Sequence, residues 1–335
     1  MKFFYQTLSV ISVTVGSIVG AGFISGRELV SFFGTESFIL PLSISFIILS
    51  GCLLLLFGLG ENSNGLIELN SKLLKSPKPF NVAVLISSFI SVCGIFAGLD
   101  GVYTLSIGQI QFPILSISVL VVVCFTSAYG IKGVERVSLI LIPLVIVAVF
   151  FMVFRSGSFD YGNTFIGGGI SIFNTFLYCF MNCFINLPAI IDVAKGKGKT
   201  ALIISAIISS LLLSVMAMFI LASISFGKTE NAQMPLYEAV GGVYAGLFAG
   251  VLLSALITSA LSAYYPLYSF AKKKFGVKGI IILAVCCFIF SRLGLKNIVN
   301  YAYPIIGVFG GVYLAICLVY KIKNRRLNKN FSKGR

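Results

Sequence analysis

Long apolar stretches alternate with short polar connections along almost the whole chain. A transmembrane helix needs about 20 mostly apolar residues. Ten stretches approach or exceed that length, at residues 5–33, 37–59, 80–107, 113–130, 134–154, 165–193, 200–226, 241–270, 278–293 and 297–320. The longest connections, at 60–79, 155–164 and 227–240, are too short to form a further domain. The pattern predicts an all-α polytopic membrane protein with ten transmembrane helices.

Composition agrees with this fold class. Of 335 residues, 58% are hydrophobic and 10% are charged, and the mean hydropathy is +1.04. A net charge of +15 would suggest nucleic acid as the partner of a soluble protein. Here the basic residues instead serve to orient the helices in the bilayer, and we expect no nucleic-acid partner.

Few residue types suited to catalysis are available. There is no histidine, and all eight cysteines lie inside apolar stretches without a CxxC pair, so no zinc site or disulfide framework is indicated. An intramembrane aspartyl protease needs two facing carboxyls, and only Asp100 lies well inside a span. We therefore expect no enzyme and no cofactor other than a coupling ion.

Lysine and arginine residues gather in alternate connections. With the N-terminus inside, twenty fall on the inner side and four on the outer side, namely Arg155, Lys228, Arg292 and Lys296. This asymmetry predicts that both termini are cytoplasmic, and it favours an even number of spans. Lys2 precedes a long apolar run that lacks a cleavage site, so the first span is expected to stay attached.

Two spans have sequences that would make poor continuous helices. Span 1 contains VGSIVGAGFISG at Val15–Gly26, and span 6 contains three glycines at 167–169 followed by the polar, proline-containing run Asn174–Asp192. Glycine destabilises a helix interior by about 1 kcal/mol relative to alanine. Broken helices inside a bilayer are tolerated where they are buried in protein or line a cavity. Taken alone, each run is also compatible with close helix packing through small residues.

The position of the two broken spans predicts an internal repeat. Span 1 opens the first five helices and span 6 opens the second five, and an odd repeat length places the halves in opposite orientations. We therefore predict a 5+5 inverted repeat, with residues 1–155 and 156–320 as the halves and 321–335 as a basic cytoplasmic tail. Matching breaks in inverted halves are a pointer to a binding site at the membrane midplane.

The sequence VGSIVGAGF resembles the unwound first helix of the amino acid–polyamine–organocation superfamily and of the LeuT-type sodium symporters. The variant GAGFISGRE most resembles the YkvI-like bacterial membrane proteins. The resemblance implies a LeuT-type fold in a bacterial cytoplasmic membrane. It also implies secondary transport of a small organic solute, an amino acid, driven by sodium. The expected partners are the solute and the lipid bilayer, and no obligate protein partner is evident.

The resemblance also implies a sodium site between spans 1 and 8. Span 8 reads Ser254–Ala260, SALITSA, and a stretch of this kind faces the break of helix 1 in the sodium symporters. The implied ligands are the carbonyls of Gly16, Val19 and Ala255 and the hydroxyls of Thr258 and Ser259. Hard cations prefer such oxygen ligands. The alternative is that both hydroxyls bond back to carbonyls of their own helix.

A solute site is predicted beside the sodium site. The amides of Gly20, Ala21 and Gly22 open the second half of span 1, and a helix start of this kind favours a carboxylate. Tyr178, Asn182 and Asn186 are four residues apart and share one face of span 6, where they could bond an amine. Tyr103 of span 3 is a further candidate for binding the solute. The alternative for these polar groups is interhelical hydrogen bonding.

Charged residues within spans are costly and usually functional. Arg27, Glu28 and Asp100 are candidates for a gate or a proton carrier, with Arg27 meeting Asp100 at an outer gate. Arg27 and Glu28 could instead simply reach the outer water. Two other functions stay open: a solute-sensing membrane subunit of the germinant-receptor type that does not transport, and a proton-coupled transporter.

Overall fold

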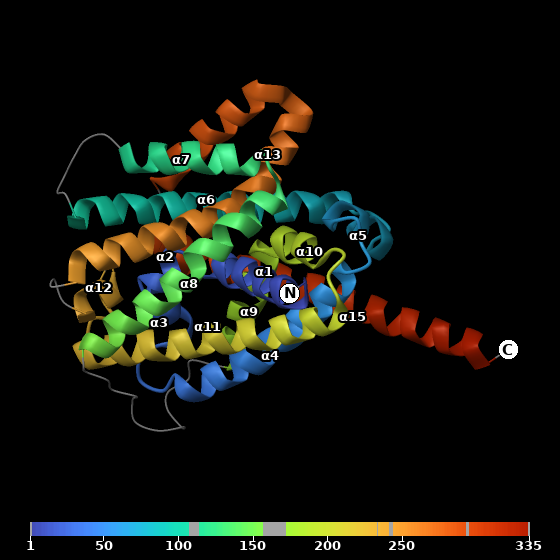
Figure 1. Ribbon diagram of the computed structural model, residues 1–335, viewed down its shortest axis with the longest axis horizontal. Coiled ribbons are helices and arrows are strands. Elements are labelled where there is room, and N and C mark those ends of the chain that lie inside the picture. The colour runs from blue at the N-terminus through green and yellow to red at the C-terminus, as the bar shows by residue number, and fades with distance from the viewer. Residues whose placement is uncertain are drawn as a thin grey trace.

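The computed structural model describes residues 2–106, 114–156, 172–232, 234–240, 244–292 and 295–333. Helices make up these ranges almost entirely, and no strand occurs in them. Figure 1 shows them as a bundle in which α7, α6, α13, α8 and α11 run roughly along the long axis. In chain order they are α1 Lys2–Ile18, α2 Ala21–Ile24, α3 Arg27–Phe33, α4 Ile39–Gly60, α5 Leu66–Leu73, α6 Lys78–Ser106, α7 Ile114–Ser127, α8 Ile131–Ser156, α9 Ile172–Ile185, α10 Leu187–Ala194, α11 Lys199–Gly227, α12 Pro235–Val240, α13 Ala245–Ser291, α14 Leu295–Asn297, the π-helical turn η2 Ile298–Ala302 and α15 Tyr303–Lys333.

These helices match the ten predicted spans. Six helices of the described residues are each long and apolar enough to cross a membrane, and the bent pair α9–α10 makes a seventh span. One of the six, α13, contains two predicted spans, because its helix is interrupted at Gly276. Span 1 is divided among α1, α2 and α3, and the shorter α7 corresponds to span 4. The predicted all-α polytopic fold is confirmed, and so are the breaks in helices 1 and 6.

The connection between spans 8 and 9 differs from the expected loop. Helix geometry continues through the lysine-rich segment and is interrupted only at Gly276, which has φ 64° and ψ −148°. A positive φ of this kind is adopted readily only by glycine. The chain can turn at the single residue Gly276, because Lys272 to Lys274 can remain helical in the part of α13 that extends beyond its apolar residues. Short helices α5 and α12 also occupy connections that the pattern left unassigned.

The broken helices lie in the middle of the bundle. α1 packs against α8, α11 and α13, and nearly all of its residues from Thr7 onward are buried. α9 packs along α15, where a Cβ added at Gly307 would lie 2.7 Å from the carbonyl oxygen of Leu177. Close approach through glycines is a usual means of helix packing in membranes, where no hydrophobic effect draws helices together.

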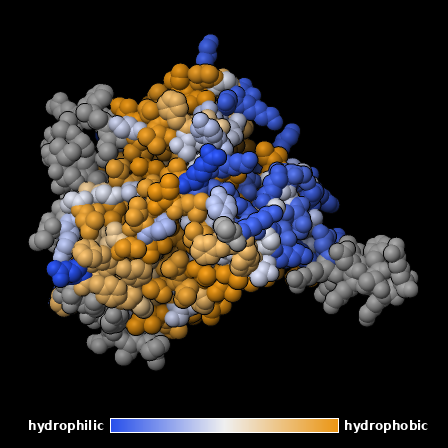
Figure 2. Space-filling view, in the orientation of Figure 1, coloured by the Kyte–Doolittle hydropathy of each residue, from blue (hydrophilic) through white to orange (hydrophobic). Residues whose placement is uncertain are grey.

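The surface is divided by polarity. Figure 2 shows an apolar surface over most of the bundle and polar residues gathered toward the end that carries the C-terminal helix α15. Large apolar side chains such as Phe125 and Ile47 are strongly exposed, which is normal for helices that face lipid.

Candidate functional site: a cavity between two broken helices

The first break leaves backbone groups of span 1 without helical partners. In a continuous helix the Gly20 amide would donate to the Gly16 carbonyl. Here it donates to the Ile18 carbonyl at 2.9 Å, and within the described part of the chain neither Gly16 nor Val19 has a backbone donor to its carbonyl. The amides of Ala21 and Gly22 likewise donate to no described carbonyl. Carbonyls and amides at this break are thus available to other partners.

The second break lies at Asn186, where α9 and α10 meet at 63°. Pro188 follows in the first turn of α10 and cannot donate to the preceding turn. The side chains of two asparagines brace the bend. Asn186 Nδ2 donates to the carbonyl of Asn182 at 3.0 Å, and Asn182 Nδ2 donates to the carbonyl of Tyr178 at 3.1 Å.

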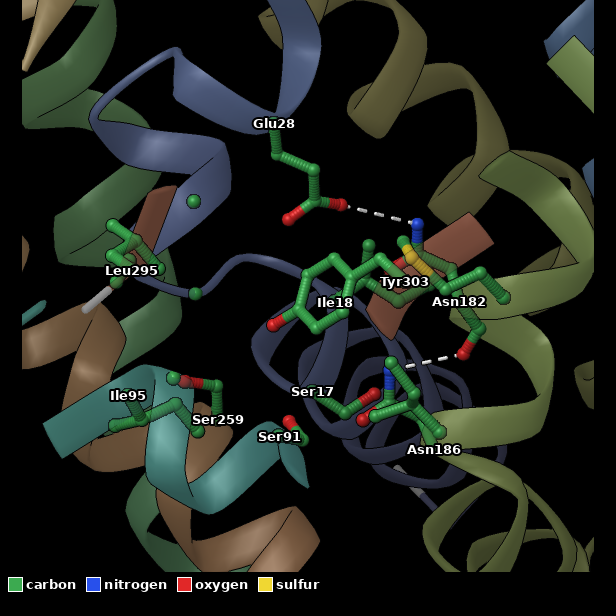
Figure 3. A pocket seen from close by; sticks show the side chains of 16 residues that line it. Ser17, Ile18, Glu28, Ser91, Ile95, Asn182, Asn186, Ser259, Leu295 and Tyr303 are labelled. Atoms are coloured by element: carbon green, nitrogen blue, oxygen red, sulfur yellow. Dashed lines mark hydrogen bonds between the residues drawn. The ribbon is translucent and has the colours of Figure 1, made fainter. Parts of the chain in front are cut away.

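The two breaks face one small cavity (Figure 3). Its free volume is about 20 Å³, room for about one water molecule. Span 1 contributes Gly20 to Gly22 to the wall, and α9 and the bend contribute Asn182 and Asn186. Other parts of the lining come from α6, α13, α14 and α15, namely Ser91, Gly94, Ile95, Ser259, Leu295 and Tyr303. Backbone amides, hydroxyls and side-chain amides therefore converge on a site at the centre of the bundle.

Glu28 is part of this cavity, and the prediction that it could simply reach outer water is wrong. Its side chain is 5% exposed, and Asn182 Nδ2 donates to its Oε1 at 3.4 Å. The chain turns at Gly26, which has φ 80°, and α3 then directs Glu28 back toward α2 (Figure 3). A Cβ added at Gly22 would lie only 2.7 Å from Glu28 Oε2. The carboxyl thus lies beside Gly22, one of the three residues whose amides were predicted to bind a solute carboxylate.

Arg27 points away from the cavity. Its Nη1 donates to the carbonyls of Glu230 at 3.2 Å and Ala232 at 3.5 Å, in the connection before α12. Arg27 therefore ties α3 to that connection. The side chains of Asp100 and Tyr103 lie outside the described residues, so the predicted Arg27–Asp100 gate and the Tyr103 contact stay predictions.

The structure places the break in span 1 beside Thr258 and Ser259 of α13. A Cβ added at Gly16 would lie 3.3 Å from the Cβ of Thr258, and one at Gly20 would lie 3.1 Å from Ser259 Oγ. The hydroxyls also make the back-bonds of the alternative interpretation. Thr258 Oγ1 donates to the Ala255 carbonyl at 2.9 Å, and Ser259 Oγ donates to the Leu256 carbonyl at 3.3 Å. A hydroxyl that donates in this way keeps lone pairs that can face a cation.

Tyr178 does not line the cavity. Its ring packs edge-on against Phe32 and Phe33 of α3, with ring centroids 5.6 Å and 4.8 Å away. The four-residue spacing placed it correctly on one face of α9 with Asn182. Because that face extends beyond the cavity, Tyr178 packs against α3 and does not reach the cavity.

Three polar lining residues were not predicted from the sequence: Ser17, Ser91 and Tyr303. Ser17 lies within the VGSIVGAGF motif, whose small residues already marked the break. Ser91 and Gly94 are three residues apart on α6, a spacing that places them on the same helix face. Tyr303 begins α15 directly after a π-helical turn, and such turns are frequent at functional sites.

The second half of span 6, α10, is fastened to its neighbours by polar contacts. Tyr265 of α13 donates to Asp192 Oδ2 of α10 at 2.9 Å. Asp192 Oδ1 lies at the start of α5, 3.1 Å from where a Cβ of Gly65 would stand. After α10, Lys197 forms an ion pair with Glu135 of α8 at 3.1 Å. These contacts join α10 to three neighbouring elements.

By sequence, the chain is similar to a bacterial protein. No family model matches the chain. The chain is 24% identical over 327 residues to the uncharacterized protein YyaD of Bacillus subtilis (strain 168), covering 91% of this chain and 94% of that protein.

Two solved structures are similar to this one. One is Mhp1, a nucleobase-cation-symport-1 family transporter in a closed conformation with bromovinylhydantoin bound, with a TM-score of 0.68, 15% identity, and coverage of 92% of this chain and 77% of that one. The other is MhsT in complex with L-phenylalanine, with a TM-score of 0.63, 16% identity, and coverage of 92% and 88%. The LeuT-type fold implied by the span 1 motif is confirmed. Membership of the YkvI-like branch stays a prediction.

Proposed function

We propose that the protein is a cation-coupled secondary transporter that moves a small organic solute across the membrane by alternating access. The observation that supports this most is the meeting of two broken helices at one polar cavity in the middle of the bundle. Discontinuous helices supply the substrate and ion sites of many secondary transporters. The fold shared with two solved transporters agrees with this class.

The proposed solute is an amino acid. The Ala21 and Gly22 amides can bind a carboxylate, and Asn182, Asn186 and the hydroxyl groups opposite can bind an amine or a polar side chain. MhsT, whose structure contains L-phenylalanine, shares the fold. Because the cavity has room for about one water molecule, solute entry requires the helices to move apart.

The proposed coupling ion is sodium, held by the carbonyls of Gly16, Val19 and Ala255 and the hydroxyls of Thr258 and Ser259. The Gly16 and Val19 carbonyls have lost their helical donors. Gly16 lies against Thr258, since a Cβ added at Gly16 would be 3.3 Å from the Cβ of Thr258. A site without a carboxylate binds a hard cation weakly, on the order of millimolar affinity.

The experiment has two steps. A thermal-shift screen of amino acids identifies the ligand, and its affinity is then measured against sodium concentration, with potassium keeping ionic strength constant. We expect sodium to raise the affinity by about 5- to 150-fold. Thr258→Ala combined with Ser259→Ala should abolish the rise. Ser262→Ala is the matched control, because its buried hydroxyl makes the same kind of back-bond one turn further along α13.

Two outcomes would contradict the proposal. An affinity of the unmodified protein that ignores sodium would exclude the sodium site. Binding without uptake into proteoliposomes would favour the solute-sensing subunit over a transporter.

Glu28 favours proton coupling as a second candidate. Its buried carboxyl lines the cavity, and within the described residues no lysine or arginine pairs with it. An ionisable group inside a membrane protein is by default a candidate for proton transfer or ligand binding. If a solute carboxylate binds at the Gly22 amide beside Glu28, repulsion between the two carboxylates would favour a proton on Glu28.

A further inference from the structure

A second, larger concavity lies far from the central cavity, between α5 and α15. It is a groove of about 620 Å³. Lys72 and Leu73 of α5 form one side. Residues of α15 form the other side, namely Ala315, Ile316, Val319, Tyr320, Lys323 and Asn324. The transport site does not include any of these residues.

Hydrogen bonds of Asn70 join α5 to α15 and α6 beside the groove. Asn70 of α5 accepts a hydrogen bond from the Tyr313 hydroxyl of α15 at 2.7 Å and donates to Asn81 of α6 at 2.6 Å. Both Asn70 and Tyr313 are fully buried. The opposite face of α5 exposes Ile67 to 75%, as expected for a helix that lies at a membrane surface.

The polarity of the groove changes along α15. Ala315, Ile316 and Val319 belong to an apolar stretch of α15, whereas Lys323 lies in the basic segment that begins at Lys321. At 1.5 Å per residue, Ala315 and Lys323 are about 12 Å apart along the helix. The groove is therefore apolar along the last span and carries its lysines toward the basic segment of the chain.

The polar end carries a net positive charge. Lys323 is exposed and forms no described ion pair, while Lys72 pairs with Glu68 one turn earlier. The hydrogen bond and charge of Glu68 raise the pKa of Lys72, so Lys72 stays protonated. Basic pockets between helices on the cytoplasmic side of a membrane bind anionic headgroups.

We propose that this groove binds one anionic phospholipid, with the phosphate between Lys72 and Lys323 and an acyl chain along Ala315, Ile316 and Val319. Charge complementarity selects an anionic headgroup, and the apolar floor selects a lipid over a free anion. Such a lipid would hold α5 against α15 at the end of the bundle where α10 is also fastened.

Native mass spectrometry of the full-length protein tests this site, with phosphatidylglycerol and phosphatidylcholine of identical acyl chains as probes. We expect preferential retention of one phosphatidylglycerol. Lys72→Gln with Lys323→Gln should weaken its binding by about fivefold per lysine. Lys273→Gln with Lys278→Gln is the control, because both lysines are exposed and removing them changes the net charge equally elsewhere.

Two more variants separate the groove from general surface charge. Ala315→Trp fills the apolar floor without changing charge and should reduce phosphatidylglycerol binding. Glu68→Gln releases Lys72 and should strengthen it. Equal retention of the two lipids, equal losses in the control pair, or lipid binding that Ala315→Trp leaves intact would each overturn the proposal.

Discussion

Glu28 is the residue whose environment is most demanding. An ionised carboxylate in a protein interior costs several kcal/mol unless other groups compensate it. Its described hydrogen bond is a long one from Asn182, and the titratable groups that face it are Tyr178 of α9 and Tyr303 of α15. Neither tyrosine supplies a positive charge. A proton, or a cation that enters the cavity, is therefore the natural partner of this carboxyl.

If Glu28 carries the coupling proton, Glu28→Gln should abolish uptake driven by a pH gradient while preserving exchange of solute across the membrane. Glutamine keeps the size and the hydrogen bonding of a protonated glutamate but cannot release a proton. The measurement is accumulation and counterflow in proteoliposomes at several pH values. Glu36→Gln is the control, since Glu36 is exposed. Accumulation that persists in Glu28→Gln would remove Glu28 as the carrier.

At this scale, sequence was informative where the backbone itself forms the site. Gly16, Gly20 and Gly22 were predicted at the break, and the structure places them beside Thr258, Ser259 and Glu28 respectively. Side-chain directions were harder to predict, because they depend on the rotation of each helix about its axis and on the backbone conformation at the turn between α2 and α3. Glu28 reaches the cavity only because Gly26 adopts a positive φ, and a glycine in sequence does not reveal which sign its φ will take.

Among the elements, the contact between α9 and α15 is the most sensitive to side-chain size. Gly307→Ala should lower the melting temperature, because its Cβ would lie 2.7 Å from the Leu177 carbonyl oxygen. Both atoms are held by the backbone, so neither can move away without shifting a helix. Overpacking of this kind costs about 1–3 kcal/mol. Gly250→Ala of α13, with nothing within 4 Å of its added Cβ, should be neutral or slightly stabilising. Thermal unfolding in detergent compares the two, and equal melting temperatures would contradict the packing argument.

Element existence followed from apolar run length, whereas element ends did not. The ten spans were predictable because each must fill a bilayer. The lysine-rich connection at Lys272–Lys274 was expected to be a loop, and it is helical because lysine is a good helix former. The direction in which α10 leaves Asn186 was likewise not predictable, as asparagine and proline indicate a break without fixing its angle.

Across the whole molecule, the Tyr265–Asp192 hydrogen bond fastens α10 to α13. Tyr265→Phe should loosen α10 by about 1 kcal/mol, the usual net value of a hydrogen bond. Hydrogen exchange of the Leu187–Ala194 amides should then be about fivefold faster. Tyr268→Phe, one turn along α13, is the control and should leave α10 unchanged. Unaltered exchange in Tyr265→Phe would show that other contacts hold α10 in place.

The global architecture was the most predictable level. Hydropathy, the positions of the two broken spans and one motif sufficed to predict the fold that the solved transporters share. The predicted inverted repeat, the cytoplasmic termini and the sodium ligands stay predictions. The side on which the termini lie and the sodium ligands depend on a membrane and an ion, and helix packing does not report on either.

The smallness of the central cavity sets a thermodynamic cost on recognition. A protein whose binding-competent form is a minor fraction of the population has an apparent dissociation constant equal to the intrinsic one divided by that fraction. With free space of about 20 Å³, the packed form of this protein cannot be the form that first admits a solute. A measured affinity will therefore reflect both the intrinsic affinity of the open form for the solute and the free energy needed to open the packed form. Substitutions far from the cavity can then strengthen binding simply by destabilising the packed form.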